Sequence, residues 1–157
     1  MTGVQTCALP ISTSRSLTGI CAMASYDLEL QSPPKESRAF ELWLQHAAGR
    51  ILMEDVRAYA LENIAAGLTA EARAAAEKSI NDALYGLMMV IDGESGTLST
   101  ENQQVELSVQ VQLVERSSSD VIAAIDLREG DGMCMGYHGW REGDFGKHPV
   151  RSEEHHV

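Results

Sequence analysis

In the middle of this chain the spacing of the apolar residues changes from a helical period to a strand period. Over residues 79–93 they recur every third or fourth position, as on one face of an α-helix; this stripe consists of Ile80, Ala83, Leu84, Leu87, Met88 and Ile91. Between Val105 and Leu113 they alternate strictly with polar residues, as in a strand with one covered face. Helices followed by strands, without repeated alternation of the two, predict an α+β fold.

The stretch of residues 79–93 is expected to end a helix that begins near residue 70. Thr69 has a hydroxyl that can cap the first turn, and Gly93 can adopt the left-handed backbone just past the last turn. Gly86 is unfavourable in the middle of a helix, so we expect a close backbone approach there. Tyr85, Met89 and Val90 lie off the main stripe, which predicts burial against more than one neighbour. We interpret the Met88–Met89 pair as core-filling.

A helical pattern also occupies the residues before Gly67. Ser32 followed by two prolines is a favourable helix entrance, because serine can cap the helix and proline fits its first turn. From residue 40 the apolar residues follow one helical face, and beyond Gly49 this stripe changes phase. The change predicts either a kink at Gly49–Arg50 or two separate helices. The short connection of residues 67–69 predicts an antiparallel pair of helices.

The strand pattern predicts a small antiparallel β-hairpin. Residues 94–103 are polar and are expected to form a loop, residues 105–113 the first strand and residues 121–127 the return strand, with a turn at Ser117–Asp120. Residues 26–30 also alternate, which predicts a short edge strand or an extended lead-in. The expected fold is therefore two or three N-terminal helices packed on a small antiparallel sheet.

The charge of the chain limits the classes of partner. It carries 12 Lys and Arg residues against 23 Asp and Glu residues, a net charge of −11. Such a surface repels phosphate backbones, so we expect no nucleic-acid partner, and it suits a basic protein partner. No apolar stretch has the length of a membrane span. Cys134 is the only cysteine after Met23, so we expect no disulfide framework within the chain and a cytoplasmic location.

Both ends of the chain resemble translated sequencing-library adapters. Residues 1–12, MTGVQTCALPIS, match one adapter strand read from a GTG start, and residues 151–157, RSEEHHV, match the complementary strand after a single inserted C. The resemblance implies that residues 1–12 and 151–157 are artefacts and that residues 13–22 are upstream sequence, with Met23 as a plausible native start. We therefore expect residues 23–150 to form a single domain, and the resemblance implies nothing about function.

The segment of residues 129–146 is the candidate site, because it combines six glycines with three aromatic residues. This composition predicts an ordered, loop-rich segment that packs over the sheet or around the core. Its polar and aromatic side chains are the candidate binding residues: Asp131, Tyr137, His138, Trp140, Glu142 and Asp144.

Cys134 is a weaker candidate for catalysis, with His138 or His148 as its base, since a thiolate needs a base or a positive charge beside it. A lone cysteine between two methionines is more often a packed thiol. Cys134 and His138 lack the second ligand pair of a zinc site, so we expect no metal, and we expect no cofactor because neither a Walker loop nor a dinucleotide fingerprint is present. His46, on the first helix, is interpreted as a partly exposed structural histidine.

These observations leave three interpretations of function. The first is a small, acidic, bacterial-type protein-binding or regulatory module, of the immunity-protein type that covers a basic partner. The second is a small metal- or cysteine-dependent enzyme that uses Cys134, His138 and neighbouring acids. The third is a domain whose role the sequence does not specify.

Overall fold

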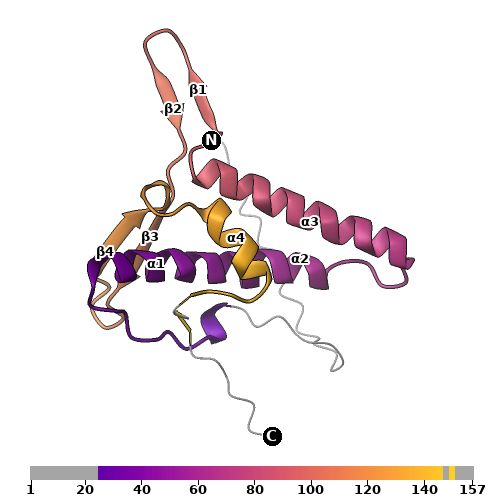
Figure 1. The fold of residues 1–157 in the computed structure, drawn as a ribbon, viewed down its shortest axis with the longest axis horizontal. Helices are drawn as coiled ribbons and strands as arrows, with labels where there is room; N and C mark the ends of the chain where they lie inside the picture. The colour runs from indigo at the N-terminus through magenta and orange to yellow at the C-terminus, as the bar shows by residue number, and fades with distance from the viewer. Residues whose placement is uncertain (1–24, 147–148, 151–157) are drawn as a thin grey trace, which may run out of the picture.

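The computed structural model describes residues 25–146 and 149–150, and its fold is α+β as predicted (Figure 1). The segments that resemble adapters, residues 1–12 and 151–157, lie outside the described residues. In chain order the elements are a 3-10 turn at Ser25–Asp27, α1 (Ser37–Ile51), a π-helix at Leu52–Ala58, α2 (Tyr59–Glu62), α3 (Ala70–Ile91), β1 (Thr97–Ser99), β2 (Gln104–Glu106), β3 (Gln110–Val114), β4 (Val121–Asp126), a 3-10 turn at Leu127–Glu129 and α4 (Met133–Arg141). No helix among these is long and apolar enough to cross a membrane.

The first helix begins later than its sequence predicted. Its N-cap is Glu36, whose carboxylate accepts hydrogen bonds from the backbone N–H groups of Arg38 at 3.0 Å and Ala39 at 2.6 Å. The predicted entrance at Ser32 is therefore wrong, and the prolines lie in an extended lead-in. Before them Leu30 forms an isolated antiparallel bridge with Val150, but Ser25–Asp27 is a 3-10 turn, so the alternating residues 26–30 form no edge strand.

The phase change after Gly49 comes from the π-helix and not from a kink or a break. The backbone stays helical from α1 through Leu52–Ala58 into α2. A π-turn closes hydrogen bonds between residues five apart, so each such turn rotates the following side chains relative to an α-helical stripe. The apolar residues that follow Leu52 therefore change face while the helix continues.

Helix α3 has its predicted bounds. The hydroxyl of Thr69 accepts a hydrogen bond from the N–H of Ala72 at 3.2 Å, and Gly93 has a φ of 76°. Its buried face is narrower than the predicted stripe and consists of Leu84, Met88 and Ile91, whereas Ala83, Leu87 and Met89 are exposed. A Cβ added at Gly86 would have no atom within 4 Å, so the expected close approach there is wrong. One side of α3 packs against more than one neighbour, namely α4, the π-helix and α2 (Figure 1).

The alternating stretch after α3 forms parts of two hairpins, not one strand. β1 pairs antiparallel with β2, and β3 pairs antiparallel with β4 from Gln110 opposite Asp126 to Val114 opposite Val121. The predicted loop of residues 94–103 thus contains β1, because Thr100 and Gln103 form a tight turn that reverses the chain before β2. The β1–β2 hairpin projects away from the helices, with Leu98 and Val105 exposed (Figure 1).

The glycine-rich C-terminal segment is a core element. It contains α4, which contacts both α1 and α3, so the prediction of a loop-rich segment is wrong although the segment is ordered (Figure 1). Four of the ten residues in the main buried cluster come from this segment: Met133, Tyr137, Trp140 and Phe145. Gly49 and Gly136 make room for Trp140, since a Cβ at Gly49 would lie 2.5 Å from its ring and a Cβ at Gly136 would lie closer still.

Candidate functional site

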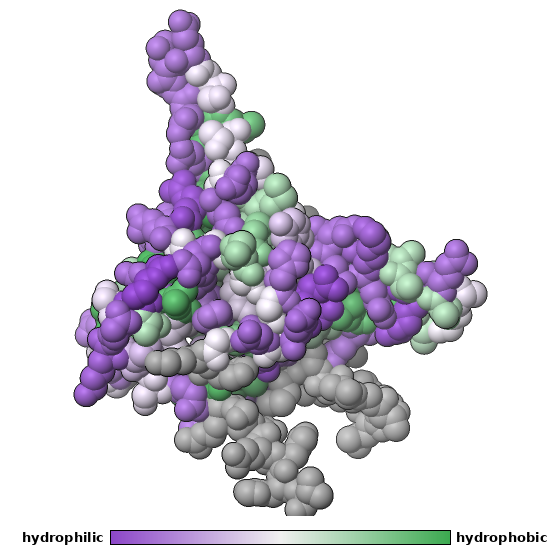
Figure 2. Space-filling model, in the orientation of Figure 1, coloured by the Kyte–Doolittle hydropathy of each residue, from purple (hydrophilic) through white to green (hydrophobic). Residues whose placement is uncertain are grey.

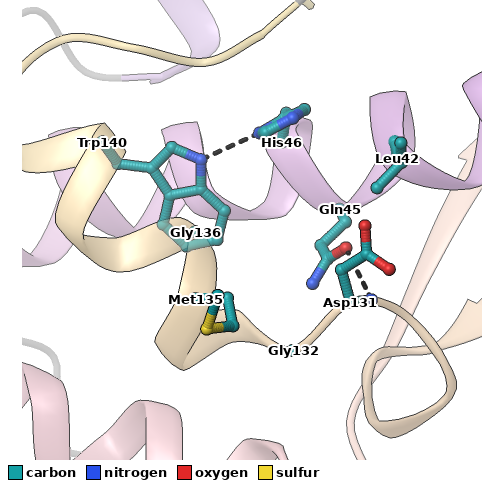
Figure 3. Close-up of a pocket in the computed structure, with 8 residues that line it drawn as sticks. All are labelled: Leu42, Gln45, His46, Asp131, Gly132, Met135, Gly136 and Trp140. Carbon is teal, nitrogen blue, oxygen red and sulfur yellow. Dashed lines mark hydrogen bonds between the residues drawn. The ribbon is translucent and has the colours of Figure 1, made fainter.

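A cavity of about 460 Å³ opens between α1 and the segment that leads into α4. Figure 3 shows side chains from both sides of it, with Leu42, Gln45 and His46 on α1 facing the segment of residues 131–140. We call this cavity the α1–α4 pocket, and it is lined by Leu42, Gln45, His46, Asp131, Gly132, Met135, Gly136 and Trp140. Its volume lies in the range of small-ligand and side-chain sites.

Gln45 is more deeply buried than His46 and Asp131, the other polar side chains that line the pocket. It is only 4% exposed, and its Oε1 accepts a hydrogen bond from the backbone N–H of Asp131 at 3.2 Å (Figure 3). Within the described part of the chain its Nε2 is buried and has no hydrogen-bond partner. The pocket therefore contains one hydrogen-bond donor that the fold itself does not use.

His46 and Trp140 join the two walls of the pocket. The indole Nε1 of Trp140 donates a hydrogen bond to Nδ1 of His46 at 2.9 Å, and the two rings meet edge to face with their centres 6.1 Å apart (Figure 3). The acceptor role requires that Nδ1 carry no proton. Because Trp140 is only 3% exposed, its ring forms a fixed apolar wall.

The mouth of the pocket is acidic. Asp131 is exposed there and pairs with Arg38, which also pairs with Glu41 at 3.3 Å. Beside Asp131 lies a smaller recess of about 130 Å³, lined by Glu41, Ile125, Asp126, Glu129 and Gly130. We call Glu41, Asp126, Glu129 and Asp131 the acidic rim.

The carboxylates of the acidic rim outnumber the cations that pair with them. Asp126 accepts hydrogen bonds from Arg128 and Ser108, and these hold the pKa of its carboxyl group well below the usual range. Among the described residues the ion pairs of the rim involve two guanidinium groups, those of Arg38 and Arg128. Two guanidinium groups against four carboxylates leave the acidic rim with a net negative charge, and of these carboxylates Asp131 lines the α1–α4 pocket itself.

Cys134 lies on α4, where its neighbours favour the neutral thiol. Burial raises its pKa to about 11, and the hydrogen bond and negative charge of Asp92 act in the same direction. The same carboxylate accepts hydrogen bonds from the backbone N–H groups of Met133 at 2.6 Å and Cys134 at 2.8 Å, so it caps the first turn of α4. A neutral thiol is a poor nucleophile, so this environment does not favour the catalytic role considered for Cys134.

Among the described residues, His138 forms no hydrogen bond with Cys134, for which it was considered as a base. The ring of His138 packs against Tyr85 and Tyr137, with ring centres 5.7 Å and 5.8 Å apart. Among the described residues no three His, Cys, Asp or Glu side chains are placed to hold a metal ion. His148, the other base considered, lies outside the described residues.

The six candidate binding residues are divided by the fold. Asp131 and Trp140 line the α1–α4 pocket, whereas Tyr137 is buried in the core and donates a hydrogen bond to the carbonyl of Asn81 at 2.9 Å. His138, Glu142 and Asp144 are exposed, and Asp144 accepts a hydrogen bond from the N–H of Gly146 in a turn.

Sequence reasoning missed Gln45 as a site residue and assigned His46 a structural role only. One signal in the sequence does indicate Gln45. It lies in a helical stretch where Trp43, Leu44 and Ala48 are apolar, and a polar residue buried there must find a partner.

Comparisons with known proteins found no matching family model, no similar curated protein and no similar solved structure.

Proposed function

We propose that this chain is a protein-binding module that receives a basic partner at the α1–α4 pocket. The observation that carries the proposal is the acidic rim beside a pocket with apolar walls. Protein interfaces place apolar anchor side chains in such pockets and use the surrounding charges to select and orient the partner. A segment with basic side chains around an apolar one is complementary to this arrangement.

The charge of the whole chain supports the same partner. Its net charge of −11 attracts a basic protein over distances of about one Debye length, roughly 10 Å at 0.1 M salt, and raises the rate of association. On the face drawn in Figure 2 hydrophilic residues predominate, and the hydrophobic ones lie in small separate areas among the described residues. If the role of the module is regulatory, it covers the functional surface of its basic partner, as immunity-type proteins do.

The enzyme interpretation has less support. The raised pKa of Cys134 disfavours a thiolate at neutral pH, and no three metal-ligating side chains come together among the described residues.

The proposal is tested with two capped peptides, acetyl-Lys-Lys-Leu-Lys-Lys-amide as the basic probe and acetyl-Glu-Glu-Leu-Glu-Glu-amide as the acidic probe. Their affinities for the full chain are measured by calorimetry at about 0.05 M and about 0.5 M salt. We expect the basic probe alone to bind, with an affinity that falls steeply as salt is added. Equal affinities for both probes, or binding that ignores salt, would contradict the proposal.

A charge reversal locates the interaction on the molecule. Glu129→Lys changes an exposed carboxylate of the acidic rim and should weaken binding of the basic probe about fivefold, the size of one surface ion pair. Glu101→Lys makes the same charge change at the exposed turn between β1 and β2 and serves as the control. Equal weakening by both substitutions would place the interaction elsewhere.

A further inference from the structure

The buried amide of Gln45 has an orientation that the fold determines. Its Oε1 accepts the N–H of Asp131 at 3.2 Å. Rotating the amide by half a turn would place its NH₂ group against that N–H and lose the bond. The donor nitrogen therefore points away from that N–H; it lies beside Gly130, where an added Cβ would be 3.3 Å from it, and Figure 3 draws it on the side of Met135 and Gly132.

An unused buried donor is unusual in a folded protein. Most buried polar groups have at least one hydrogen-bond partner, because a buried donor without one loses its hydration and gains nothing in return. In the described residues the side-chain atoms in this state are Nε2 of Gln45 and Nε of Arg50. Arg50 still uses another nitrogen in its ion pair with Glu54 at 2.9 Å, whereas the only donor group of Gln45 remains unused.

The pocket limits the chemistry of a group that could accept this hydrogen bond. The group must be an acceptor, and the acidic rim disfavours an anion there, so a neutral carbonyl fits best. The side chains of Leu42, Met135 and Trp140 give the pocket apolar walls. Met135 is 75% exposed and unbranched, so it can adapt to the shape of an entering group.

We infer that the α1–α4 pocket binds one peptide unit of a partner, whose main-chain carbonyl accepts a hydrogen bond from Nε2 of Gln45. The side chain of that unit is apolar and packs against Leu42, Met135 and Trp140, and a neighbouring basic side chain meets the acidic rim. This inference rests on the proposed function and adds the chemistry by which the partner is recognised.

The decisive variant is Gln45→Glu, which is close to isosteric. It keeps an oxygen for the N–H of Asp131 and replaces the donor nitrogen by a second acceptor. Loss of the carbonyl hydrogen bond should weaken binding of the basic probe about tenfold, or about 1.4 kcal/mol. Charge alone predicts the opposite change in affinity, because an added carboxylate should strengthen binding of a basic peptide.

The two proposals fail in different ways. If the wild-type chain does not prefer the basic probe, the proposed function fails. If it does prefer the basic probe and Gln45→Glu binds that probe equally well or more tightly, the inference fails while the proposed function stands. Thermal unfolding of the variant checks that it is folded.

A measurement on the wild-type chain does not depend on the variant. The probe acetyl-Lys-Lys-Gly-Lys-Lys-amide keeps the charge and the carbonyl groups but lacks the apolar side chain. The basic probe should bind at least about threefold more tightly than this glycine probe and should shift the side-chain NH₂ signals of Gln45 in an NMR titration. Equal affinities, or unchanged Gln45 signals when the basic probe is saturating, would overturn the inference.

Discussion

The indole of Trp140 donates a hydrogen bond to Nδ1 of His46 at 2.9 Å, and this contact fastens α4 to α1 beside the pocket. Trp140 comes from the glycine-rich segment that the sequence marked as a candidate site, and His46 comes from a helix 94 residues earlier. The contact therefore gives the pocket one wall from each region of the chain.

Replacing His46 should destabilise the protein through Trp140. His46→Ala leaves the buried indole N–H without its acceptor, which should lower the free energy of unfolding by about 1–3 kcal/mol in urea titrations. His46→Asn provides an oxygen near the position of Nδ1 and should recover part of the loss. Equal stability of the wild type and both variants would show that the hydrogen bond does not hold the two helices together.

Asp92 should stabilise the start of α4 although it belongs to the end of α3. Asp92→Ala removes the acceptor for two backbone N–H groups and should cost about 1–2 kcal/mol of unfolding free energy. Asp82→Ala, which removes an exposed carboxylate elsewhere on the same helix, is the control and should cost less than about 1 kcal/mol. A loss no greater than that of the control would contradict the capping role.

The raised pKa of Cys134 predicts a decline of stability at alkaline pH. The thiol has a pKa of about 11 in the folded chain against an ordinary value of 9.0, so between these values the unfolded chain releases its proton first. The free energy of unfolding should therefore be unaffected by Cys134 below about pH 9 and should fall as the pH rises from about 9 to about 11. Cys134→Ser should remove this part of the decline, and an unchanged profile in the variant would argue against it.

The same pKa shift predicts slow alkylation. In a chain whose other cysteines, Cys7 and Cys21, are replaced by serine, Cys134 should react with iodoacetamide at pH 8 at least about tenfold more slowly than free cysteine. Asp92→Asn should speed the reaction, because the negative charge of Asp92 is one cause of the raised pKa. Labelling as fast as that of free cysteine would restore Cys134 as a candidate nucleophile.

Glycines in the helices should respond differently to alanine. Gly49→Ala and Gly136→Ala each place a methyl group against the ring of Trp140 and should cost about 1–3 kcal/mol of unfolding free energy. Gly86→Ala is the matched control, because it lies within α3 with open space around it and should stabilise the chain by up to about 1 kcal/mol. Thermal or urea unfolding of the three variants measures the expected loss of stability in the first two and the expected gain in the third.

Local signals in the sequence were sufficient for α3 and for the fold class. Thr69 and Gly93 act through their own backbone neighbours, so the bounds of the helix can be predicted without tertiary contacts. The change from a helical to a strand period likewise separates α1, α2 and α3 from the two hairpins, although α4 follows the hairpins.

Features that depend on distant partners could not be predicted in the same way. The alternation of residues 105–113 does not indicate that the two halves of this segment pair with different strands. Helix α4 contains Gly136 and Gly139, which are poor helix formers, and its first turn is capped by Asp92 from 41 residues away. The apolar neighbours of Gln45 indicate only that it is buried, whereas its partner Asp131 lies 86 residues later and cannot be identified from a local pattern.

The position of the binding site is tested most directly by NMR titration of the ¹⁵N-labelled full chain with the basic probe. We predict that the largest shifts occur at the indole N–H of Trp140, the side-chain NH₂ of Gln45 and the backbone N–H of Asp131, and that about 0.5 M salt reduces them. Shifts confined to the β1–β2 hairpin or to α3, with these three signals unchanged, would contradict the proposed site.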